Sequence, residues 1–567
     1  MTITYVNNQA STQQVLSGLN DMLVVGLDGA VTVQSDPAIR IEYVPGATVV
    51  VNGLVATESR GITTATASLQ PAMSSGVSVE IGEHGLIVAG VGIDLLGQSN
   101  TVSNDGIIKA SQEGVLMTGL DSTLVNNGRI TANNWAATLN GDFASIVNNG
   151  TVTSSSNGGV ALLGSHADLV NAGMIGAQGN GYAAAVMTAN EGSIRNTGTM
   201  ASQNGQGLFL ASDSSGGAPG WIDVFNAGTI SGKVNAVEVS DFYGTTTVRL
   251  VNAGVLAGTV QLAGGNDLYD GREGKAFGTI SMGGGNDVAL GGAGAESMDG
   301  GAGNDDLEGD GGNDVIVGGA GADTIDGGMG NDTLWGEDGD DAIDAGDGHD
   351  LVYGDAGADF LTGGAGIDTL SYVLSNVAVK VNLATGEASG GFAQGDEFTG
   401  FERLVGSGFA DTLTGSAKSD TIEGGDGADI VKGGAGGDLI RGGAGSDTIE
   451  GGAGRDVLFG GDGADLFRYR ALGDSKVDPT ARDVIRDFQV GVDKIDLALI
   501  DASTKAIGNQ AFTWIDQADF SKAAGQLHYR TADGNTLVEG DVNGDGAADF
   551  SILLNGTLAL SATDFML

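Results

Sequence analysis

The sequence predicts an all-β protein: a right-handed parallel β-solenoid, then a narrower β-roll, then a β-rich C-terminal cap. Three observations lead to this prediction. Glycine provides 102 of the 567 residues while proline provides only 5, which favours a turn-rich repeat fold. The first half repeats an asparagine–glycine motif at long, slightly unequal intervals, and the second half repeats an aspartate in a nine-residue phase. Repeats of this kind are typical of solenoids, in which each coil packs on the next.

The motif of the first half has the pattern aliphatic-x-Asn-x-Gly-x-aliphatic, as in VSNDGII, LVNNGRI and LVNAGMI. Alternate residues of a strand share one face, so we expect the asparagines to point inward with the aliphatic residues. Two or three short strands per coil would then stack them, and each amide would bond along the axis. A divergent copy, IGEHGLI, places Glu83 in the asparagine position. The asparagines are Asn104, Asn126, Asn148, Asn171, Asn196, Asn226 and Asn252.

The nine-residue repeat forms two arrays, each with an apolar residue two positions after the acidic one. The first array contains Asp287, Asp305, Asp314, Asp323, Asp332, Asp341, Asp350, Asp359 and Asp368, with Glu296 in the remaining slot. The second contains Asp411, Asp420, Asp429, Asp438, Asp447, Asp456 and Asp465. A disordered acidic linker would not preserve this phase, so a folded repeat is predicted.

Each apolar residue is expected to lie on a very short strand. With two nonapeptides per coil, each loop would stack on the loop two nonapeptides further along. Glycines such as Gly319, Gly321, Gly328 and Gly330 would let the loops adopt positive φ and bring backbone carbonyls close together. Carboxylates and carbonyls are the ligands that calcium prefers. Asp314 would then share an ion with the loop of Asp332. If each ion needs two stacked loops, the arrays would hold about thirteen calcium ions, and calcium binding would drive folding.

The charge distribution supports a divalent cation as partner. Lys and Arg total 24 against 72 Asp and Glu, giving a formal net charge of −48. Such a chain repels nucleic acid and acidic membrane surfaces, which makes both poor partners. No apolar run approaches the ~20 residues of a membrane-spanning helix. The N-terminal sequence lacks a basic segment followed by an apolar core, so no Sec signal peptide is expected. Cysteine is absent, which excludes disulfides and thiolate metal sites.

The nonapeptides, together with the sequence that follows them, resemble the RTX calcium-binding proteins of Gram-negative type I secretion. DVIRDFQVGVDKIDL (483–497), TLVEGDVNGDGAADFSILLNG (536–556) and the final LSATDFML resemble a serralysin-type C-terminal domain. The resemblance implies export by the type I secretion machinery and a secreted or cell-surface location. The expected domains are capping strands at 1–80, solenoid at 81–260, RTX arrays at 261–370 and 406–465 around a strand-rich spacer at 371–405, and the C-terminal domain at 466–567.

Two further motifs bear on metals. Asp541, Asn543 and Asp545 match the start of an EF-hand loop, although Ile552 occupies the position where a bidentate glutamate is expected. An additional calcium site and a tight acidic turn are both compatible with this pattern. Serralysins are zinc proteases, but the His-Glu-x-x-His signature is absent and the four histidines are scattered. Protease activity is therefore not inferred.

Two functions remain open at this stage. The first is a non-enzymatic adhesin, surface-layer or matrix protein that folds on meeting extracellular calcium and whose partner is a cell-surface glycan or lipopolysaccharide. The second is an extracellular polysaccharide lyase or uronate epimerase with its active site on the solenoid, because acidic-sugar chemistry can be built on a β-helix. Basic residues are sparse before residue 260, and Arg129 and Arg195 occupy different motif positions, so no cluster is expected. Trp135 and Trp221 are expected to serve packing more than sugar stacking.

Overall fold

The computed structural model describes the chain except for residues 1, 19, 43, 65–74, 213–219 and 241–245. The described residues contain no α-helix; apart from strands and turns they form the 3-10 helices η2 (Gly391–Ala393) and η3 (Ala562–Asp564). The chain forms two compact units, Met1–Asp310 and Gly311–Leu567. The predicted all-β class is confirmed. The division between the units lies inside the first nine-residue array, and the domain limits expected from the sequence remain predictions.

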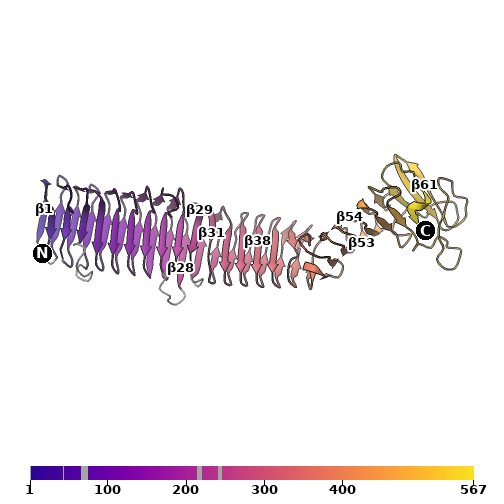
Figure 1. The fold of residues 1–567 in the computed structure, drawn as a ribbon, viewed down its shortest axis with the longest axis horizontal. Coiled ribbons are helices and arrows are strands. Elements are labelled where there is room, and N and C mark those ends of the chain that lie inside the picture. Colours follow the sequence, from indigo (N-terminus) through magenta and orange to yellow (C-terminus); the bar gives the residue numbers. More distant parts are fainter. Residues whose placement is uncertain (1, 19, 43, 65–74, 213–219, 241–245) are drawn as a thin grey trace. The chain divides into compact units, whose positions relative to one another are not determined.

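Three short strands per coil, stacked in parallel on the coils before and after, build most of the N-terminal unit (Figure 1, indigo to magenta). The first strands of the coils are β1 (Ile3–Val6), β4 (Met22–Val25), β7 (Thr48–Val51), β10 (Ser78–Ile81), β13 (Thr101–Asn104), β16 (Thr123–Asn126), β19 (Ser145–Asn148), β22 (Ala167–Asn171), β25 (Glu191–Asn196), β28 (Trp221–Asn226) and β30 (Thr247–Asn252). The second strands are β2 (Gln9–Ala10), β5 (Ala30–Val33), β8 (Leu54–Thr57), β11 (Leu86–Ala89), β14 (Ile107–Ala110), β17 (Arg129–Ala132), β20 (Thr151–Ser154), β23 (Met174–Ala177) and β26 (Thr199–Ser202). The third strands are β3 (Gln14–Leu16), β6 (Ile39–Ile41), β9 (Arg60–Thr64), β12 (Val91–Leu96), β15 (Val115–Thr118), β18 (Ala137–Asn140), β21 (Val160–Leu163), β24 (Ala185–Thr188) and β27 (Leu208–Ala211).

The asparagine–glycine motif lies at a corner of each coil rather than along one straight strand. In the first regular copy, Val102 and Asn104 end β13 with both side chains buried, and Ile108 is buried in β14 after the turn at Gly106. The stacked asparagines form the predicted ladder, in which each Nδ2 donates to the Oδ1 of the next coil at 2.7–2.8 Å. All seven asparagines are fully buried.

The divergent copy differs from the expectation for Glu83. Ile81, not Glu83, is in register with Asn104, and Glu83 is exposed in the turn. The turn between Ile81 and Gly85 is two residues longer than the turn between Asn104 and Gly106, so Glu83 lies outside the stacked position. The ladder therefore begins at Asn104, and an aliphatic side chain covers its first member.

The three-strand coil becomes a two-strand coil because its second and third strands merge. β29 (Thr229–Ser240) pairs with β26 through its first residues and with β27 through its last ones. β31 (Val255–Gln261) then pairs with β33 (Lys275–Ala276) and β34 (Ile280–Gly284). The two-strand coils that follow in this unit contain β32 (Leu268–Asp270), β35 (Val288–Leu290), β36 (Ser297–Ala302) and β37 (Asp306–Glu308).

The C-terminal unit begins with the same two-strand coils. We call all the two-strand coils, from β32 onward, the roll. Stacked partners are two nonapeptides apart, as predicted; Ile316 is in register with Leu334 and Ile325 with Ile343. One face contains β39 (Thr324–Asp326), β41 (Ala342–Asp344), β44 (Phe360–Thr362), β49 (Glu397–Thr399), β47 (Lys380–Asn382), β51 (Thr412–Thr414), β53 (Ile430–Gly436), β55 (Thr448–Gly454), β57 (Leu466–Arg468) and β59 (Lys494–Asp496). The other contains β38 (Val315–Ala320), β40 (Thr333–Asp338), β43 (Leu351–Tyr353), β46 (Thr369–Ser371), β50 (Arg403–Val405), β52 (Thr421–Asp426), β54 (Leu439–Gly445), β56 (Val457–Gly463) and β58 (Val484–Ile485).

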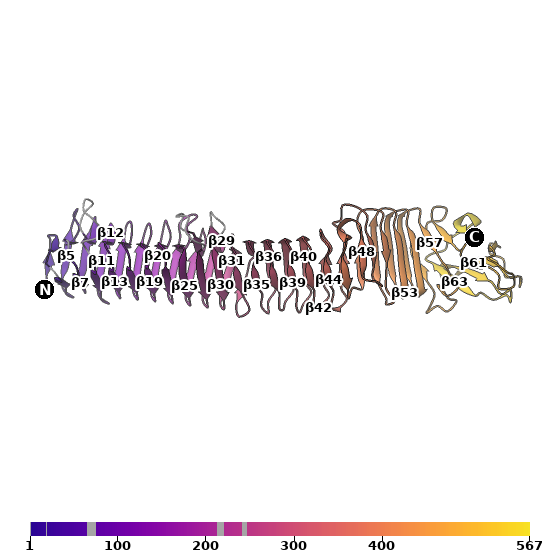
Figure 2. The ribbon, with the colours of Figure 1, turned by 90° about the horizontal axis from the view of Figure 1, so that it is seen from below.

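The segment between the arrays continues the roll instead of interrupting it. On one face β50 lies between β46 and β52, in parallel with both. On the other face an antiparallel pair, β47 and β48 (Glu387–Ser389), lies between β49 and β51 (Figure 2). A short parallel pair of loop strands, β42 (Asp347–Gly348) and β45 (Ala365–Gly366), accompanies the first array. The spacer therefore continues the strand pairing of the roll on both faces while adding strands to one of them.

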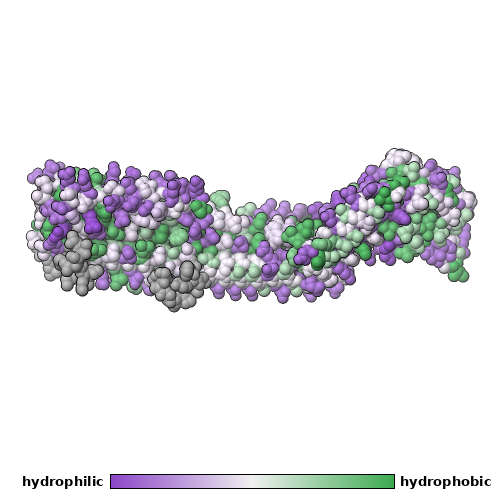
Figure 3. Space-filling model, viewed as in Figure 1, coloured by the Kyte–Doolittle hydropathy of each residue, from purple (hydrophilic) through white to green (hydrophobic). Residues whose placement is uncertain are grey.

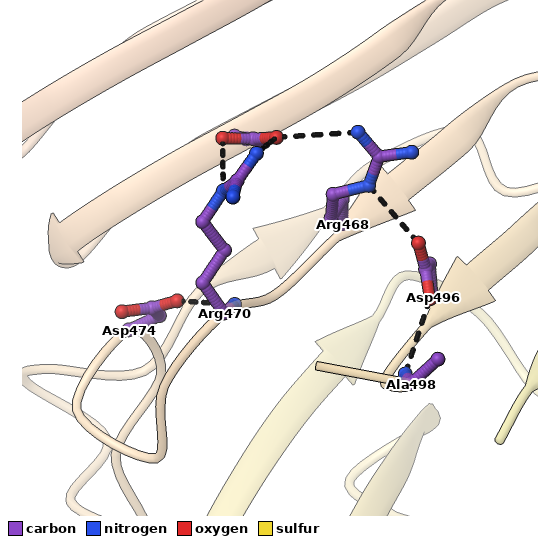
Figure 4. Close-up of polar contacts among 6 residues, drawn as sticks. Arg468, Arg470, Asp474, Asp496 and Ala498 are labelled. Carbon is purple, nitrogen blue, oxygen red and sulfur yellow. Dashed lines mark hydrogen bonds and ion pairs between the residues drawn. The ribbon is translucent and has the colours of Figure 1, made fainter. Parts of the chain in front are cut away.

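The C-terminal residues cap the roll. An antiparallel sheet of β61 (Gln526–Ala532), β62 (Asn535–Asp541) and β63 (Phe550–Leu554), joined by β60 (Thr513–Trp514), places β63 on β58. β64 (Phe565–Met566) pairs with β59. Arg468 bridges Glu450 and Asp496, and Arg470 binds both carboxylate oxygens of Glu450 at 2.7 and 2.8 Å (Figure 4). These contacts tie the last coils to the cap.

The surface differs along the chain. On the face shown in Figure 3, hydrophilic residues gather along one edge of the N-terminal coils, whereas hydrophobic residues are prominent on the cap. Exposed apolar side chains of the cap include Val492, Leu499 and Ile507. Across the described residues, no helix has the length and apolar character needed to span a membrane.

Candidate metal centre

The loops of the roll are shaped by glycines whose backbone other residues rarely adopt. Gly319 and Gly328 have φ of +113° and +89°, and Gly321 and Gly330 have φ of +139° and +142°. A Cβ added at Gly330 would lie 1.3 Å from the backbone oxygen of Gly312, one coil earlier. No larger residue fits there, because stacked loops bring main chain against main chain. The loops therefore present closely spaced backbone groups.

An aspartate at the end of each loop is buried, with at most 3% of its surface exposed in both arrays. Its Oδ1 accepts a hydrogen bond from the backbone N–H of the aspartate one coil earlier, as between Asp314 N and Asp332 Oδ1 at 2.8 Å. The same contact joins 287 to 305, 323 to 341, 332 to 350, 341 to 359, 350 to 368, 411 to 429, 420 to 438, 429 to 447, 438 to 456 and 447 to 465. The structure thus brings together the aspartates that the repeat spacing paired.

The second carboxylate oxygen, Oδ2, is buried without a hydrogen-bond partner at many of these positions. These are Asp287, Asp332, Asp341, Asp350, Asp359, Asp368, Asp429, Asp438, Asp447, Asp456 and Asp465. Oδ2 lies against the first glycine of its own loop: a Cβ at Gly336 would be 2.1 Å from Oδ2 of Asp341. A Cβ at Gly442 would be 2.4 Å from Oδ2 of Asp447. Buried anionic oxygen without a partner is costly, so these positions favour a bound cation.

The electrostatics point the same way. Burial raises the pKa of Asp341, Asp429 and Asp438 to about 7; the backbone hydrogen bond to each carboxylate opposes this rise, and neighbouring aspartates add to it. Burial also acts to raise the pKa of Glu450, yet the adjacent Arg470 outweighs it, and this pKa ends below its ordinary value. No cationic side chain contributes to the pKa shifts of Asp341, Asp429 and Asp438. They are therefore destabilised as anions unless a cation binds.

Carboxylates alone do not form a complete coordination shell. Within the part of the chain that the structure describes, no three acidic or histidine side chains converge in an arrangement suited to a metal. An ion at the loops would therefore need backbone carbonyl oxygens in addition to the aspartates. A donor set made only of oxygen, on a glycine-rich loop, suits calcium. The residues present thus fit calcium, with the carboxylates and the loop carbonyls as its ligands.

Four aspartates beyond the two predicted arrays extend the ladders. Asp267 and Asp396 continue the first array: Asp267 N donates to Asp287 Oδ1 at 2.7 Å, and Asp396 Oδ1 accepts from Asp359 N at 3.1 Å. Asp483 and Asp493 accept from the backbone N–H groups of residues 456 and 465 at 2.9 and 3.0 Å. Each has an apolar residue two positions later, at Tyr269, Phe398, Ile485 and Ile495. Asp483 also lies two nonapeptides after Asp465, in the phase of the second array, whereas the other three share only the apolar offset.

The loop that begins at Asp541 is satisfied by its own backbone. The two Asp541 oxygens accept from the N–H groups of Gly544 and Gly546 at 2.6 and 2.9 Å. Asn543 Oδ1 accepts from Asp545 N at 2.8 Å, and Ile552 is fully buried in β63. This is the geometry of a tight acidic turn. Calcium binding by Asp541, Asn543 and Asp545 remains a prediction.

The two tryptophans differ in environment. Trp135 packs edge-on against Tyr182 with 6.2 Å between ring centroids, in agreement with a packing role. Trp221 is 45% exposed on β28, so packing does not account for it. Sequence reasoning grouped the two because it could not tell which strand face Trp221 would occupy.

Two protein families match the chain. The RTX calcium-binding nonapeptide repeat matches in four copies, at residues 283–307, 299–334, 308–343 and 335–370. The Peptidase M10 serralysin C-terminal family matches residues 414–567 and so includes most of the second array. RTX repeats bind several calcium ions per protein and indicate a secreted calcium-binding protein.

Three solved structures are similar to parts of the chain. The AlgE6R3 subunit of the Azotobacter vinelandii mannuronan C5-epimerase is 32% identical, over 28% of this chain and 78% of that chain, with a TM-score of 0.15. The AlgE6R2 subunit of the same epimerase is 30% identical over 29% and 92%, with a TM-score of 0.17. The extracellular lipase LipA from Serratia marcescens is 17% identical over 45% and 40%, with a TM-score of 0.18.

TM-scores this low indicate no function for this chain. The two family matches, the nonapeptide phase and the roll agree with one another. The chain therefore contains RTX calcium-binding nonapeptide repeats at 283–370 and a serralysin-type C-terminal domain at 414–567.

Proposed function

We propose that this protein is a non-enzymatic adhesin, surface-layer or matrix protein of a Gram-negative bacterium, exported by type I secretion and folded by extracellular calcium. The observation that supports it most is the contrast between the two ladders. In the asparagine ladder only Oδ1 of the first member, Asn104, lacks a partner, whereas the aspartate ladders bury an unpartnered carboxylate oxygen at many successive coils. A roll of this kind would stay unfolded where calcium is scarce and fold where it is abundant.

The ladder aspartates are the proposed calcium ligands, with loop carbonyls completing each site. Asp267, Asp396, Asp483 and Asp493 join the two arrays in this proposal because they make the same stacked contact. The glycines Gly319, Gly321, Gly328 and Gly330 would act through backbone geometry alone, by allowing the loops to approach. Aspartates at successive coils would then be bridged by ions instead of repelling one another.

Calcium titration of the full chain tests the proposal. Far-UV circular dichroism should report gain of β-structure between submicromolar and millimolar free calcium, while magnesium at equal concentration should not replace it, because Mg²⁺ demands tighter octahedral geometry. Isothermal titration should count several ions. An unchanged spectrum after complete chelation would overturn the calcium-folding proposal.

Export has a separate test. Secretion of a chain that lacks 466–567 should fail in a host that supplies a type I system, because the cap is proposed to contain the secretion information. The control is a chain of similar length that lacks residues 101–192, which are four whole solenoid coils, and it should still be exported. Secretion of the chain without the cap would contradict the proposed route.

A second candidate function, an acidic-polysaccharide lyase or epimerase, is favoured by one observation. Arg195, Asp223 and Arg249 line one open groove on the solenoid. The described residues that line it include no histidine or tyrosine, the side chains that most often move a proton in such chemistry. We therefore place binding ahead of catalysis. Absorbance of unsaturated products and proton NMR of a uronate polymer after incubation would detect either reaction.

A further inference from the structure

Three neighbouring strands of the solenoid, β25, β28 and β30, share an open groove of about 410 Å³ on their outer face. Its polar and aromatic lining comes from alternate residues of the strands, which point away from the core. These are Ser193, Arg195, Asp223, Phe225 and Arg249. The groove lies wholly within the N-terminal unit, and its lining residues all precede the calcium repeats in the sequence.

Strand register fixes how these side chains are arranged. Arg195 is in register with Phe225 and Val251, and Ser193 with Asp223 and Arg249. Arg195 and Arg249 therefore lie on strands that are separated by one strand, about 10 Å apart across the sheet. Along the strand direction their positions differ by two residues. Asp223 lies on the strand between them. The arrangement presents two cationic groups along one side-chain surface with a carboxylate between them.

Neither arginine has a carboxylate within ion-pairing distance. Among the described residues, Arg195 and Arg249 make no ion pair within 4.0 Å, although the whole chain has a net charge of −48. Arg272, Arg468 and Arg530, by contrast, all bind carboxylates. Arg249 lies close enough to Asp270 to help lower its pKa, and it is in register with Asp223, but neither carboxylate makes a direct ion pair with it. Two guanidinium groups without a direct ion pair can still form two-pronged hydrogen bonds to an external anion.

Aromatic rings hold one arginine in place and extend the surface. The guanidinium carbon of Arg195 lies over the Phe225 ring, 4.8 Å from its centroid. This contact restricts the side chain, so less conformational entropy is lost when it binds a ligand. Trp221 is 45% exposed on the same strand, two residues before Asp223, where its ring offers a flat apolar face.

These features together are suited to binding a polysaccharide whose sugar units carry carboxylates. A guanidinium binds a carboxylate through two parallel hydrogen bonds, an aromatic face accommodates the apolar face of a sugar ring, and Asp223 would accept from hydroxyl groups. An open groove on a flat sheet admits a polymer that continues beyond it, whereas an enclosed pocket would take only its end.

We propose that the outer face of β25, β28 and β30 binds an anionic polysaccharide whose units carry carboxylates, with Arg195 and Arg249 as the carboxylate-binding residues. This inference rests on the proposed function, since it names the chemistry of the partner of a secreted surface or matrix protein. Phe225 positions Arg195, and Trp221 adds a stacking surface for a neighbouring ring.

Binding of a uronate hexasaccharide to the full chain at fixed millimolar calcium tests this, measured by isothermal titration. A short oligosaccharide avoids gelation of a long polymer by calcium. The comparison probe is the same hexasaccharide with its carboxylates reduced to alcohols. Wild-type protein should bind the uronate at least about tenfold more tightly than the neutral probe, because each guanidinium–carboxylate contact contributes well over one hydrogen bond's worth of affinity.

Variants locate the site. Arg195→Ala and Arg249→Ala should each weaken uronate binding about tenfold or more, and Arg249→Lys should weaken it less, because the charge stays while the two-pronged geometry is lost. Arg129→Ala is the matched control, since Arg129 is an exposed arginine on β17 of the same solenoid and should leave binding unchanged. Unaltered circular dichroism and melting temperature would show that the variants fold.

The outcomes separate this inference from the proposed function. Wild-type affinity in the Arg195→Ala/Arg249→Ala double variant, equal binding of the neutral probe, or tighter binding of a sulfated hexasaccharide would each overturn the assignment. Absence of uronate binding would also overturn it while leaving calcium-driven folding intact. Conversion of the bound uronate would overturn the non-enzymatic function but would support the site.

Discussion

The asparagine ladder of the solenoid and the aspartate ladders of the roll occupy comparable places, at the corners of successive coils. In the solenoid, Asn126 accepts from Asn104 through Oδ1 and donates to Asn148 through Nδ2, each at 2.7 Å. In the roll, Asp341 accepts from the N–H of Asp323 through Oδ1, while its Oδ2 has no partner. An amide is both donor and acceptor, whereas a carboxylate only accepts.

Because of this difference, two regions with the same coiled architecture are stabilised in different ways. The solenoid completes its internal hydrogen bonds by itself, so stacking more coils adds more of the same contact. The roll repeats an incomplete contact, and each added coil adds buried negative charge. The first 260 residues have a net charge of −11 and the remainder −37. Under the proposed function, we therefore expect the solenoid to fold without calcium and the roll to need it.

Removal of calcium should produce the largest effect and should divide the two regions. After chelation with EGTA, peptides from the roll and the cap should lose protection in hydrogen–deuterium exchange, and peptides from 78–252 should keep it. The reason is that only the roll relies on metal ions to satisfy its carboxylates. Equal loss of protection in both regions, or in neither, would break the comparison.

Replacing an asparagine of the solenoid ladder by aspartate should be the most destabilising of the substitutions. Asn148→Asp replaces the donor to Asn171 by an anionic oxygen, which should destabilise the protein by about 3 kcal/mol or more with or without calcium. Thermal denaturation followed by circular dichroism measures this. Asn149→Asp, at the exposed neighbouring position, is the control and should change little. A loss of stability that calcium repairs would contradict the explanation.

The reverse substitution, aspartate to asparagine in the roll, should lower the stability of the roll with calcium and raise it without calcium. Asp438→Asn removes a charged ligand and should raise the calcium concentration needed for folding by several-fold. Under EGTA the same change should stabilise the roll, because it removes a buried anion beside Asp420 and Asp456. The exposed Asp462→Asn is the control. Calcium titrations followed by circular dichroism measure both effects. A change in stability of the same sign with and without calcium would contradict the ladder mechanism.

A change of pH should have the smallest effect on the stability of the solenoid and a measurable effect on the stability of the metal-free roll. The pKa values of Asp341, Asp429 and Asp438 are raised from 3.8 to about 7, so folding favours their protonated forms. Their stabilising contribution is therefore full below about pH 4 and is lost as the pH rises through about 7. Under EGTA the roll should therefore retain more β-structure at pH 5 than at pH 8, as measured by far-UV circular dichroism.

Excess calcium should remove or reverse that trend, because protons and calcium compete for the same carboxylates. The solenoid asparagines do not titrate, so the melting of 78–252 should not follow this window. A metal-free roll that is more stable at pH 8 than at pH 5 would show that the aspartates are not destabilised as anions.

Much of the fold could be predicted because a solenoid coil contacts only the coils beside it. The pairing of Asp314 with Asp332, the inward asparagines and the positive φ of Gly330 all follow from repeat phase and local chemistry. Departures arose where coil length changes. Glu83 left its predicted position through a longer turn, and Asp396 and Asp493 joined ladders from outside the nine-residue phase.

By itself, therefore, the sequence determined the two repeats and their buried polar residues, because these depend on spacing within one or two coils. The register that places Arg195 and Arg249 on one face also follows from the asparagine motif, since Asn196, Asn226 and Asn252 are register partners. The tertiary structure alone decided the merging of strands in β29 and the antiparallel pair of β47 and β48 inside the roll. These features depend on how segments of irregular length pack on the coils beside them, which the repeat motifs do not encode.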